Sequence, residues 1–429
     1  MEFVSTRGQD RTPIERALSL GLASDGGLFL PMQWPRLRPD DFEGADTTPR
    51  IAERLLQSFF ADSIFAADFG ALCDQAFTVQ TPLKPLRDGQ TSILELFHGP
   101  SGAFKDVGAN FLATMLAHLN RGATRDTTIL VATSGDTGSA VATAFYRRPG
   151  FRVIILFPDG RVSARQAHLL SCFGDNIQTL RVAGSFDDCQ AMAKAALADQ
   201  TLVQALNMTS ANSISLGRLL PQMSYYAEAA LRYFRAHGEP LNVVIPSGNL
   251  GNALACLIAR QIGLPIGRVL ISTNANAVLA NYVHTGNYQA APTKATIANA
   301  MDVGAPSNIE RLIYLAKHDP SILRDLDSVS VPDDAICARI QAFYQTYGEI
   351  ICPHTATAAE MLAQRRAAGD HAHYAVVATA HPAKFADVVE PLLGLSVPIP
   401  ECLKPWLARP AQAAQIGVGL DALKAALGP

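Results

Sequence analysis

Lys105 stands where a glycine-containing loop meets an apolar segment with helical spacing. The window reads Phe97-His98-Gly99-Pro100-Ser101-Gly102-Ala103-Phe104-Lys105-Asp106, and apolar residues then recur every three or four positions as far as Leu119. An amine that is desolvated between such a loop and a helix start has a lowered pKa and can form a Schiff base with an aldehyde cofactor. On this window alone, a solvated lysine near a helix N-terminus is the simpler interpretation, so other sites must decide.

A second candidate site is a strand, a loop of small residues and a helix in succession. The apolar run 241–246 ends at Ser247-Gly248-Asn249-Leu250-Gly251-Asn252, and a helical pattern follows. Backbone N–H groups in such a loop converge on an anion and the helix dipole adds partial positive charge, so the loop suits a phosphate group. It lacks the Lys-Ser/Thr ending of a P-loop and the third glycine of a dinucleotide fold. An ordinary tight turn is the alternative.

A third loop is rich in hydroxyl groups. Residues 127–132 predict a strand and 140–146 a helix, with Thr133-Ser134-Gly135-Asp136-Thr137-Gly138-Ser139 between them. Hydroxyl and backbone N–H groups in one short loop suit a carboxylate. Helix capping by Ser134 or Thr137 is the alternative. The combination of a reactive lysine, a phosphate loop and a carboxylate loop in one chain favours a catalytic role for all three.

Motifs over nearly the whole chain resemble those of threonine synthase, a pyridoxal-phosphate enzyme family of fold type II. The resemblance is carried by residues 3–8, 26–31, 94–106, 132–138, 210–214, 299–303 and 379–385, with Asn207 and Arg218. Two positions depart from the family pattern, because Ser101-Gly102 replaces Thr-Leu and Leu250 replaces Phe. Neither change removes a reacting group, so we expect an effect on rate or substrate fit only.

The resemblance implies an enzyme that converts O-phospho-L-homoserine and water into L-threonine and phosphate, the last step of threonine biosynthesis. Lys105 would hold pyridoxal 5'-phosphate as a Schiff base and later act as general base. Thr379 would meet the pyridine nitrogen and Asp136 the phenolic oxygen, although a carboxylate beside a phenolate is repelled unless one of them is protonated. The cofactor phosphate would lie on Ser247, Gly248, Asn249, Leu250, Gly251 and Asn252.

The substrate carries a carboxylate and a phosphate, and each needs its own binding groups. The carboxylate would bind to Thr133, Ser134, Gly135, Thr137 and Gly138. Arg218, which follows Asn212 and Ser213, is the leading phosphate ligand because a guanidinium group binds two oxygens at once. Lys294 and Lys384 are weaker candidates, and we expect each to be a surface lysine.

The order of elements predicts an α/β fold. Short apolar runs at 127–132, 152–157, 177–182, 241–246 and 269–273 alternate with helical patterns, which favours parallel sheets covered by helices. Residues 276–370 look mainly helical, and 374–379 return to a strand. The resemblance implies two parallel-sheet α/β domains of the tryptophan synthase β-like kind. We expect an N-terminal segment of the large domain at 1–100, a smaller nested domain with the lysine at 101–204, a large phosphate-binding domain at 205–398 that includes a helical accessory region at 276–370, and a C-terminal tail at 399–429.

The composition and charge of the chain exclude several classes of binding partner. The 429 residues carry a net charge of −3 without runs of like charge, which argues against nucleic-acid binding. No apolar run is long enough to cross a membrane, and the N-terminus does not resemble a signal peptide. The seven scattered cysteines lack a C-x-x-C pair, and the ten histidines form no metal-binding motif, so we expect free thiols, no metal and a cytoplasmic location. We expect a monomer or a homodimer.

Two other functions remain open at this point. A serine or threonine dehydratase of the same fold group would share Lys105 and the phosphate loop but would need no second phosphate site, which Arg218 supplies. A catalytically inert relative that only binds metabolites would usually have lost the lysine, and Lys105 is present.

Overall fold

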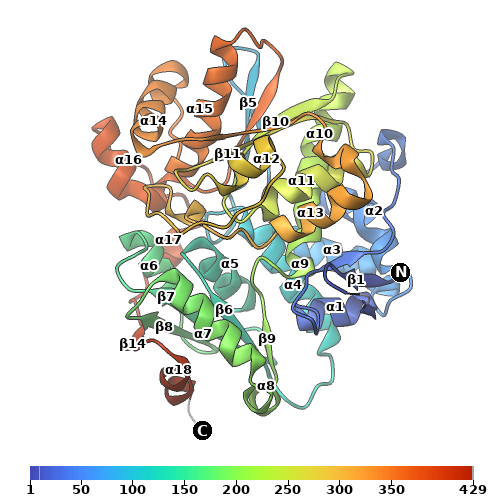
Figure 1. Cartoon of the computed structure of the whole chain (residues 1–429), viewed down its shortest axis with the longest axis vertical. Helices are drawn as coiled ribbons and strands as arrows, with labels where there is room; N and C mark the ends of the chain where they lie inside the picture. The colour runs from blue at the N-terminus through green and yellow to red at the C-terminus, as the bar shows by residue number, and fades with distance from the viewer. Residues whose placement is uncertain (9, 428–429) are drawn as a thin grey trace.

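The chain is organised around two sheets, which form the upper and lower lobes of the molecule in Figure 1. This computed structural model describes residues 1–8 and 10–427. The larger sheet has the order β12-β11-β10-β13-β5-β4, and only β4 runs antiparallel to its neighbour. Its strands are β4 (Leu83–Pro85), β5 (Thr91–Glu95), β10 (Leu241–Pro246), β11 (Ile266–Thr273), β12 (Leu326–Ser330) and β13 (Tyr374–Ala378).

The smaller sheet is parallel throughout, with the order β14-β8-β7-β6-β9. Its strands are β6 (Thr127–Ala132), β7 (Phe151–Pro158), β8 (Ile177–Val182), β9 (Met208–Ser210) and β14 (Ala414–Ile416). A separate antiparallel sheet near the N-terminus joins β1 (Phe3–Ser5), β2 (Arg11–Thr12) and β3 (Phe29–Pro31). The predicted α/β class is confirmed, and all five predicted strand runs between residues 127 and 273 are strands.

Helices cover both faces of the two sheets (Figure 1). Around the larger sheet and the N-terminal part are α1 (Ile14–Leu20), α2 (Thr48–Phe60), α3 (Phe69–Ala76), α9 (Leu216–Leu219), α10 (Met223–His237), α11 (Gly251–Gln261), α12 (Val278–Thr285), α13 (Ile309–His318), α14 (Asp333–Tyr347), α15 (Pro353–Ala367) and α16 (Ala386–Leu393). Around the smaller sheet are α4 (Lys105–Leu119), α5 (Asp136–Phe145), α6 (Ala164–Ser171), α7 (Phe186–Ala198), α8 (Gln200–Leu206), α17 (Lys404–Leu407) and α18 (Leu420–Leu427). Short 3-10 turns occur at η1 (Pro39–Phe42), η2 (Ala66–Asp68), η3 (Leu220–Gln222), η4 (Asn299–Met301), η5 (Pro320–Leu323) and η6 (Pro382–Phe385).

Burial explains why these runs became strands. Every residue of β6 and of β13 is buried, as expected for parallel strands covered on both faces. The largest apolar core joins α2, α3, α4, α10 and α11, and within it Phe60 on α2 stacks on Phe69 and meets Phe111 of α4 edge-on. This packing fixes α4, whose first residue is Lys105.

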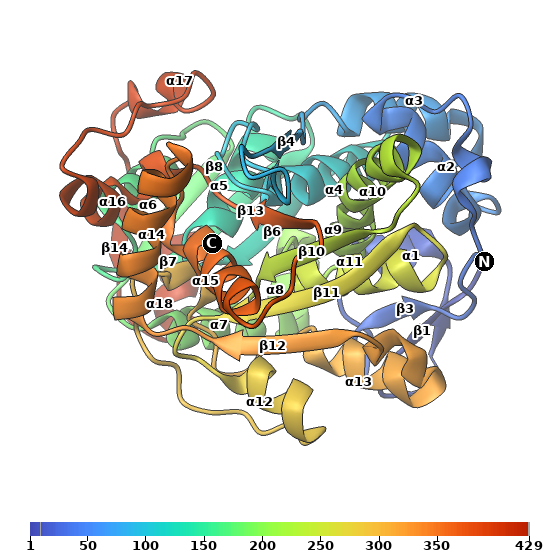
Figure 2. The ribbon, with the colours of Figure 1, turned by 90° about the horizontal axis from the view of Figure 1, so that it is seen from above.

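The prediction of a mainly helical stretch at 276–370 is wrong for residues 326–330, which form β12. This strand pairs in parallel with β11 at the edge of the larger sheet and lies beside α12 and α13 in Figure 2. Its sequence, Leu-Asp-Ser-Val-Ser, has no continuous apolar run because an edge strand is only partly buried. Within the same stretch, α15 packs on β10, β11 and β13, so the stretch forms part of the larger sheet's covering layer.

The C-terminal tail returns to the smaller sheet. Strand β14 pairs with β8, and α18 packs on α7, so the end of the chain lies below the lower lobe in Figure 1. The sequence predicts only a tail here, because Ala414 and Gln415 of the three-residue strand are exposed and form no apolar run.

Candidate active site

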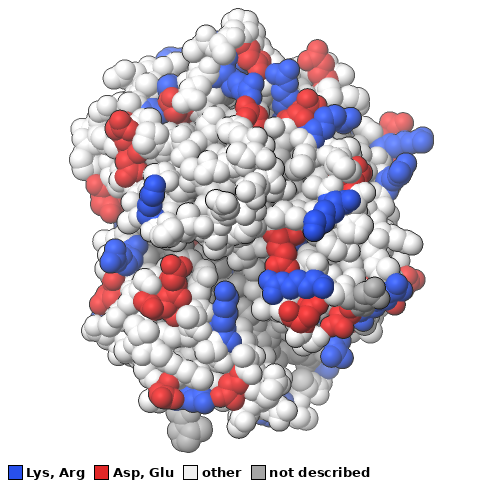
Figure 3. Space-filling view, viewed as in Figure 1, with Lys and Arg blue, Asp and Glu red and all other residues white. Residues whose placement is uncertain are grey.

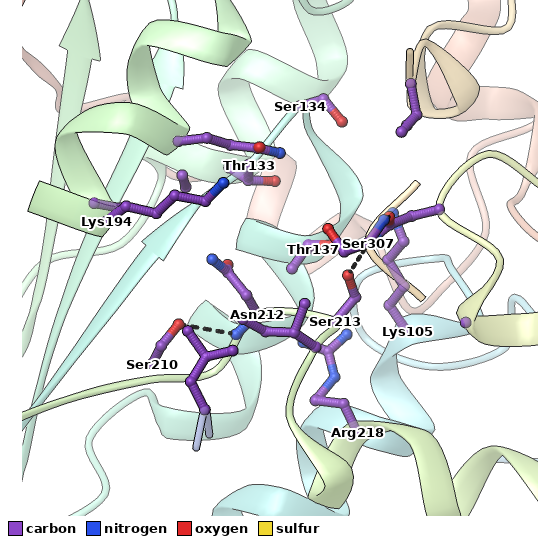
Figure 4. Close-up of a pocket in the computed structure, with 18 of the residues that line it drawn as sticks. Lys105, Thr133, Ser134, Thr137, Lys194, Ser210, Asn212, Ser213, Arg218 and Ser307 are labelled. Carbon is purple, nitrogen blue, oxygen red and sulfur yellow. Dashed lines mark hydrogen bonds between the residues drawn. The ribbon is translucent and has the colours of Figure 1, made fainter. Parts of the chain in front are cut away.

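A cavity of about 660 Å³ lies between the two lobes, and its walls come from segments far apart in the sequence. They include the start of α4, the β6–α5 loop, the β10–α11 loop and the end of β13 (Figure 4). In parallel sheets these loops follow the carboxyl ends of strands, where ligands of α/β proteins usually bind. Most of the predicted site residues line it: Lys105, Thr133, Ser134, Asp136, Thr137, Asn212, Ser213, Arg218, Ser247, Gly248, Asn249, Leu250, Gly251, Asn252 and Thr379. Gly135 and Gly138 are not among the lining residues.

Lys105 is the first residue of α4, and the backbone before it is attached to β13. Phe104 N donates to the carbonyl oxygen of Thr379 at 2.9 Å, and His381 N donates to Gly102 O at 2.9 Å. The pKa of Lys105 is lowered to about 8, chiefly by burial and also by the nearby cations Arg218 and Lys384, while the charge of Asp136 opposes the shift. The amine is therefore neutral in a useful fraction of molecules near pH 7, as a nucleophile requires.

Gly102 has a conformational role in the loop before the lysine. Its φ of +64° lies in the left-handed region that glycine favours, and an added Cβ would lie 3.2 Å from Leu403 and 3.3 Å from Lys384. Asp106 closes the same loop by accepting from Ser101 N at 3.0 Å. Gly102 N donates to Gly99 O at 2.9 Å and Gly102 O accepts from His381 N at 2.9 Å, so hydrogen bonds on both sides hold this residue in the loop.

The β10–α11 loop has the shape of an anion site. Leu250 takes a φ of +66° as the residue before α11, which turns the chain sharply into the helix. Gly248 permits the close approach of η4, because a Cβ there would be 2.7 Å from Met301 Cα. Asn249 braces the loop by donating to Ser213 Oγ at 2.6 Å and accepting from Ser307 N at 2.5 Å. The N-terminus of α11 thus faces the cavity, as a phosphate site requires.

The β6–α5 loop differs from its predicted form. Helix α5 begins at Asp136, earlier than the expected 140, because the Thr133 hydroxyl accepts from Gly135 N at 3.0 Å and from Gly138 N at 2.9 Å. Thr133 therefore caps the helix, the role that we had considered for Ser134 or Thr137. Gly135, with a φ of +136°, and Gly138, under α5, shape the loop. Ser134 and Thr137 remain at the cavity wall (Figure 4).

Lys384 is buried, so the expectation of a surface lysine is wrong for this residue. Its Nζ lies 2.7 Å from Asp136 Oδ1 and donates to Ser101 O at 2.7 Å. Burial alone would raise the pKa of Asp136, but the ammonium groups of Lys384 and Lys105 hold that pKa well below its usual range. No local pattern predicts this pair, because Asp136 follows a strand of the smaller sheet and Lys384 follows a strand of the larger sheet. Lys294 is exposed and is not among the cavity residues.

Arg218 is 2% exposed and lines the cavity from α9. One guanidinium nitrogen, Nη1, donates to Ala211 O at 2.7 Å, while Nε has no hydrogen-bond partner among the residues that the structure describes. Burial lowers its pKa to about 10, so the side chain stays charged at neutral pH. Asn212 and Ser213 lie beside it in Figure 4.

Among the cavity residues that the sequence did not predict are two with titratable side chains, Lys194 and His354. Lys194 reaches into the cavity from α7, on the side opposite Lys105 (Figure 4). His354, at the start of α15, accepts from Ala300 N through Nε2 at 3.1 Å, and burial lowers its pKa to about 4. Neither residue belongs to a motif. Only the fold brings them to the site.

Comparison with known proteins identifies the family. Three sequence-family models match: "Threonine synthase N terminus" at residues 2–77, "Pyridoxal-phosphate dependent enzyme" at 79–382 and "Threonine synthase, C-terminal" at 355–427. The threonine synthase of Haemophilus influenzae is 39% identical over 92% of this chain and 92% of its own length. The chain belongs to the threonine synthase family.

Solved structures agree with this assignment. The crystal structure of threonine synthase from Escherichia coli matches with a TM-score of 0.92 at 34% identity, covering 100% of this chain and 99% of that chain. Pyridoxal-phosphate-bound threonine synthase from Brucella melitensis matches with a TM-score of 0.89 at 32% identity, covering 99% and 98% of the two chains. Maize serine racemase, at 20% identity and a TM-score of 0.53, shares the fold alone.

Membership of this family makes pyridoxal phosphate the cofactor, and the cavity fits it. A half-buried lysine, an anion loop at a helix N-terminus and a strand-end hydroxyl at Thr379 line one space. Across residues 1–8 and 10–427, no group of three or more His, Cys, Asp and Glu side chains could hold a metal ion. Over the same residues, each helix is too short or too polar to cross a membrane. On the face shown in Figure 3, acidic and basic side chains are interspersed, and the surface is hollowed between the lobes.

Proposed function

We propose that this chain is a threonine synthase that converts O-phospho-L-homoserine and water into L-threonine and phosphate, with pyridoxal phosphate attached to Lys105. The observation that carries the proposal is the presence of two separate anion sites in one cavity. The β10–α11 loop is neutral and formed by backbone, whereas Arg218 provides a buried guanidinium group on another wall. One site suits the cofactor phosphate and the other suits the phosphate of a substrate.

Lys105 moves the protons of the reaction. When bound, pyridoxal phosphate delocalises the negative charge that develops at Cα of the substrate. With substrate and cofactor bound, the free Lys105 amine would remove a proton from Cα and then one from Cβ on the same face. Its lowered pKa keeps it available as a base near neutral pH, and its flexible four-carbon stem lets it reach both carbons.

Different walls of the cavity bind the two anionic groups of the substrate. Ser134 and Thr137, with the backbone of their loop, bind the carboxylate, while Thr133 shapes that loop. Arg218 binds the departing phosphate with Asn212 and Ser213, because a guanidinium group offers paired donors to two oxygens. Lys194 adds a second cation on the opposite wall. Thr379, which lines the cavity, would offer its hydroxyl group to the pyridine nitrogen and would not hold a proton there as a carboxylate would.

The two sheets support a nested domain arrangement. The predicted smaller domain at 101–204 stops short of β9, which pairs with β6 in the smaller sheet. We therefore infer a smaller domain at 101–210 that carries Lys105 and β6 to β9, inserted into a larger domain formed by 1–100 and 211–398. The tail at 399–429 then adds β14 to the smaller sheet. We further propose a cytoplasmic monomer or homodimer that binds no nucleic acid.

The proposed function is tested by locating the lysine that carries the cofactor and by measuring the kinetics of an Arg218 variant. Borohydride reduction of the holoenzyme, followed by peptide mapping, should modify Lys105, and modification of another lysine would reject its role.

Arg218→Lys should lower kcat/KM for O-phospho-L-homoserine by about 10- to 100-fold, roughly 1.4–2.8 kcal/mol, with cofactor content unchanged. Arg235→Lys is the matched control, because Arg235 also donates to a backbone carbonyl at 2.7 Å but lies on the surface side of α10. Turnover of serine or threonine in place of the phosphate ester would favour a dehydratase.

A further inference from the structure

The Lys384 ammonium group joins three segments at one point beside the cavity. Asp136 begins α5 after β6 of the smaller sheet, and Lys384 lies in η6 after β13 of the larger sheet. The distance between Lys384 Nζ and Asp136 Oδ1 is 2.7 Å, and the same nitrogen donates to Ser101 O in the loop before Lys105. A single side chain therefore connects both lobes to the loop that carries the catalytic lysine.

The two oxygens of Asp136 have different surroundings. Oδ1 forms the ion pair with Lys384 and accepts from Gln166 Nε2 at 3.0 Å. Gln166 is held in turn because its Oε1 accepts from Asn299 Nδ2 at 3.0 Å and from Ser163 N at 3.1 Å. Oδ2 has no hydrogen-bond partner among the described residues, and Asp136 lines the cavity. The carboxylate is thus fixed through one oxygen and keeps the other for a ligand.

Charge explains why a carboxylate can occupy this place. An isolated carboxylate beside the phenolic oxygen of a cofactor would be two anions in contact, which a buried site does not tolerate. Lys384 is wholly buried and Asp136 is 5% exposed, so their attraction is weakly screened. The ammonium group compensates the second negative charge without touching the cavity.

We propose that Lys384 is a positioning residue that holds Asp136 toward the phenolic oxygen of the cofactor, and that the opposite charges of this pair set the protonation state of the cofactor bound to Lys105. The inference rests on the proposed function, because it takes Lys105 as the attachment point. Lys384 itself makes no contact with substrate. It acts through Asp136: the carboxylate favours the protonated cofactor and the ammonium group offsets part of that effect, so the two charges together set the pH at which the cofactor loses its proton.

The charges predict opposite effects for the two partners. Removing the cation in Lys384→Met leaves extra negative charge near the cofactor, which favours its protonated form. Removing the anion in Asp136→Asn leaves Lys384 uncompensated and disfavours that form. The double variant removes both charges and should lie between the single variants. Lys84→Met is the matched control, because Lys84 forms a 2.8 Å ion pair with Glu349 on the surface.

The experiment is a pH titration of the absorbance of the bound cofactor in wild type, the three variants and the control. We expect the midpoint to rise by about one pH unit in Lys384→Met, to fall by about one unit in Asp136→Asn, and to stay unchanged in Lys84→Met. If Lys384→Met does not fold, Asp136→Asn and the double variant still give two of the three shifts. Midpoints that do not move, or that move in the same direction in both single variants, would overturn the proposal. Peptide mapping after borohydride reduction in each variant separates this outcome from failure of the proposed function, since Lys105 attachment is read independently.

Discussion

Arg218 lies against Gly108, within one helical turn of Lys105 on α4. A Cβ added at Gly108 would stand 3.1 Å from Arg218 Nε and 2.9 Å from its carbonyl oxygen. The helix that presents the reactive amine therefore also makes room for the guanidinium group that would hold the substrate phosphate. Because both groups are placed by the same helix, their separation is fixed by packing rather than by a flexible loop.

Gly108→Ala tests this arrangement. The added methyl group is too close to backbone atoms of Arg218 to be absorbed by a side-chain movement, so α9 has to shift away from α4. We expect kcat/KM for O-phospho-L-homoserine to fall at least about tenfold, because small displacements of binding groups are costly in catalysis. Cofactor absorbance should be unchanged. Steady-state kinetics equal to those of wild type would show that the contact does not position Arg218.

Lys194→Met should weaken substrate capture without affecting the chemistry. Lys194 is exposed and reaches into the cavity from α7, so its charge can attract a phosphate ester but is screened by salt. We expect a several-fold increase in KM with little change in kcat, and a smaller effect at high ionic strength. Lys317→Met, an exposed lysine on α13, is the control. An unchanged KM would exclude Lys194 from substrate binding.

Reconstitution of the apoenzyme should follow the ionisation of Lys105. Attachment of the cofactor needs a neutral amine, and burial lowers the pKa of Lys105 to about 8. At pH 7 about one amine in ten is then neutral. The attachment rate, followed by absorbance after mixing with pyridoxal phosphate, should rise with pH and level off above about pH 8. A rate that keeps rising towards pH 10.5 would show that the amine is solvated.

Burial of His354 makes the protein sensitive to acid. Its folded-state pKa is about 4, below the value of 6.5 expected in the unfolded chain, so the unfolded chain binds more protons between these values. Stability is therefore lost as the pH falls from 6.5 towards 4, by up to roughly 3 kcal/mol from this group. His354→Gln should reduce the difference in thermal midpoint between pH 7 and pH 5. Equal pH dependence in the two proteins would contradict the neutral, buried state of His354.

The sequence predicted those parts of the fold that depend on local pattern. Strand β6 has its predicted bounds, 127–132, because its apolar run reflects burial on both faces of the sheet directly. By contrast, β12 was missed because an edge strand needs no continuous apolar run. The early start of α5 depends on a hydroxyl cap that propensity does not reveal.

Site residues that belong to a local sequence motif could be predicted. Site residues that come together only when distant segments fold could not. The loop at 247–252 could be recognised because its small residues and helix start adjoin in sequence. Lys384 and Asp136 are an ion pair only because β6 and β13 end on opposite sides of one cavity, so composition favoured a surface lysine. Lys194 and His354 reach the site from helices without motifs, and no sequence spacing relates them to Lys105.

The most direct test of the account is the fate of oxygen from water. The protein with its cofactor is incubated with O-phospho-L-homoserine in heavy-oxygen water, and both products are analysed by mass spectrometry. Because water adds to Cβ after the phosphate leaves, the account predicts that the label enters the threonine hydroxyl and is absent from the phosphate, with the two products in equal amounts. Label in the phosphate, or homoserine as the product, would mean phosphate-ester hydrolysis and would contradict the proposed function.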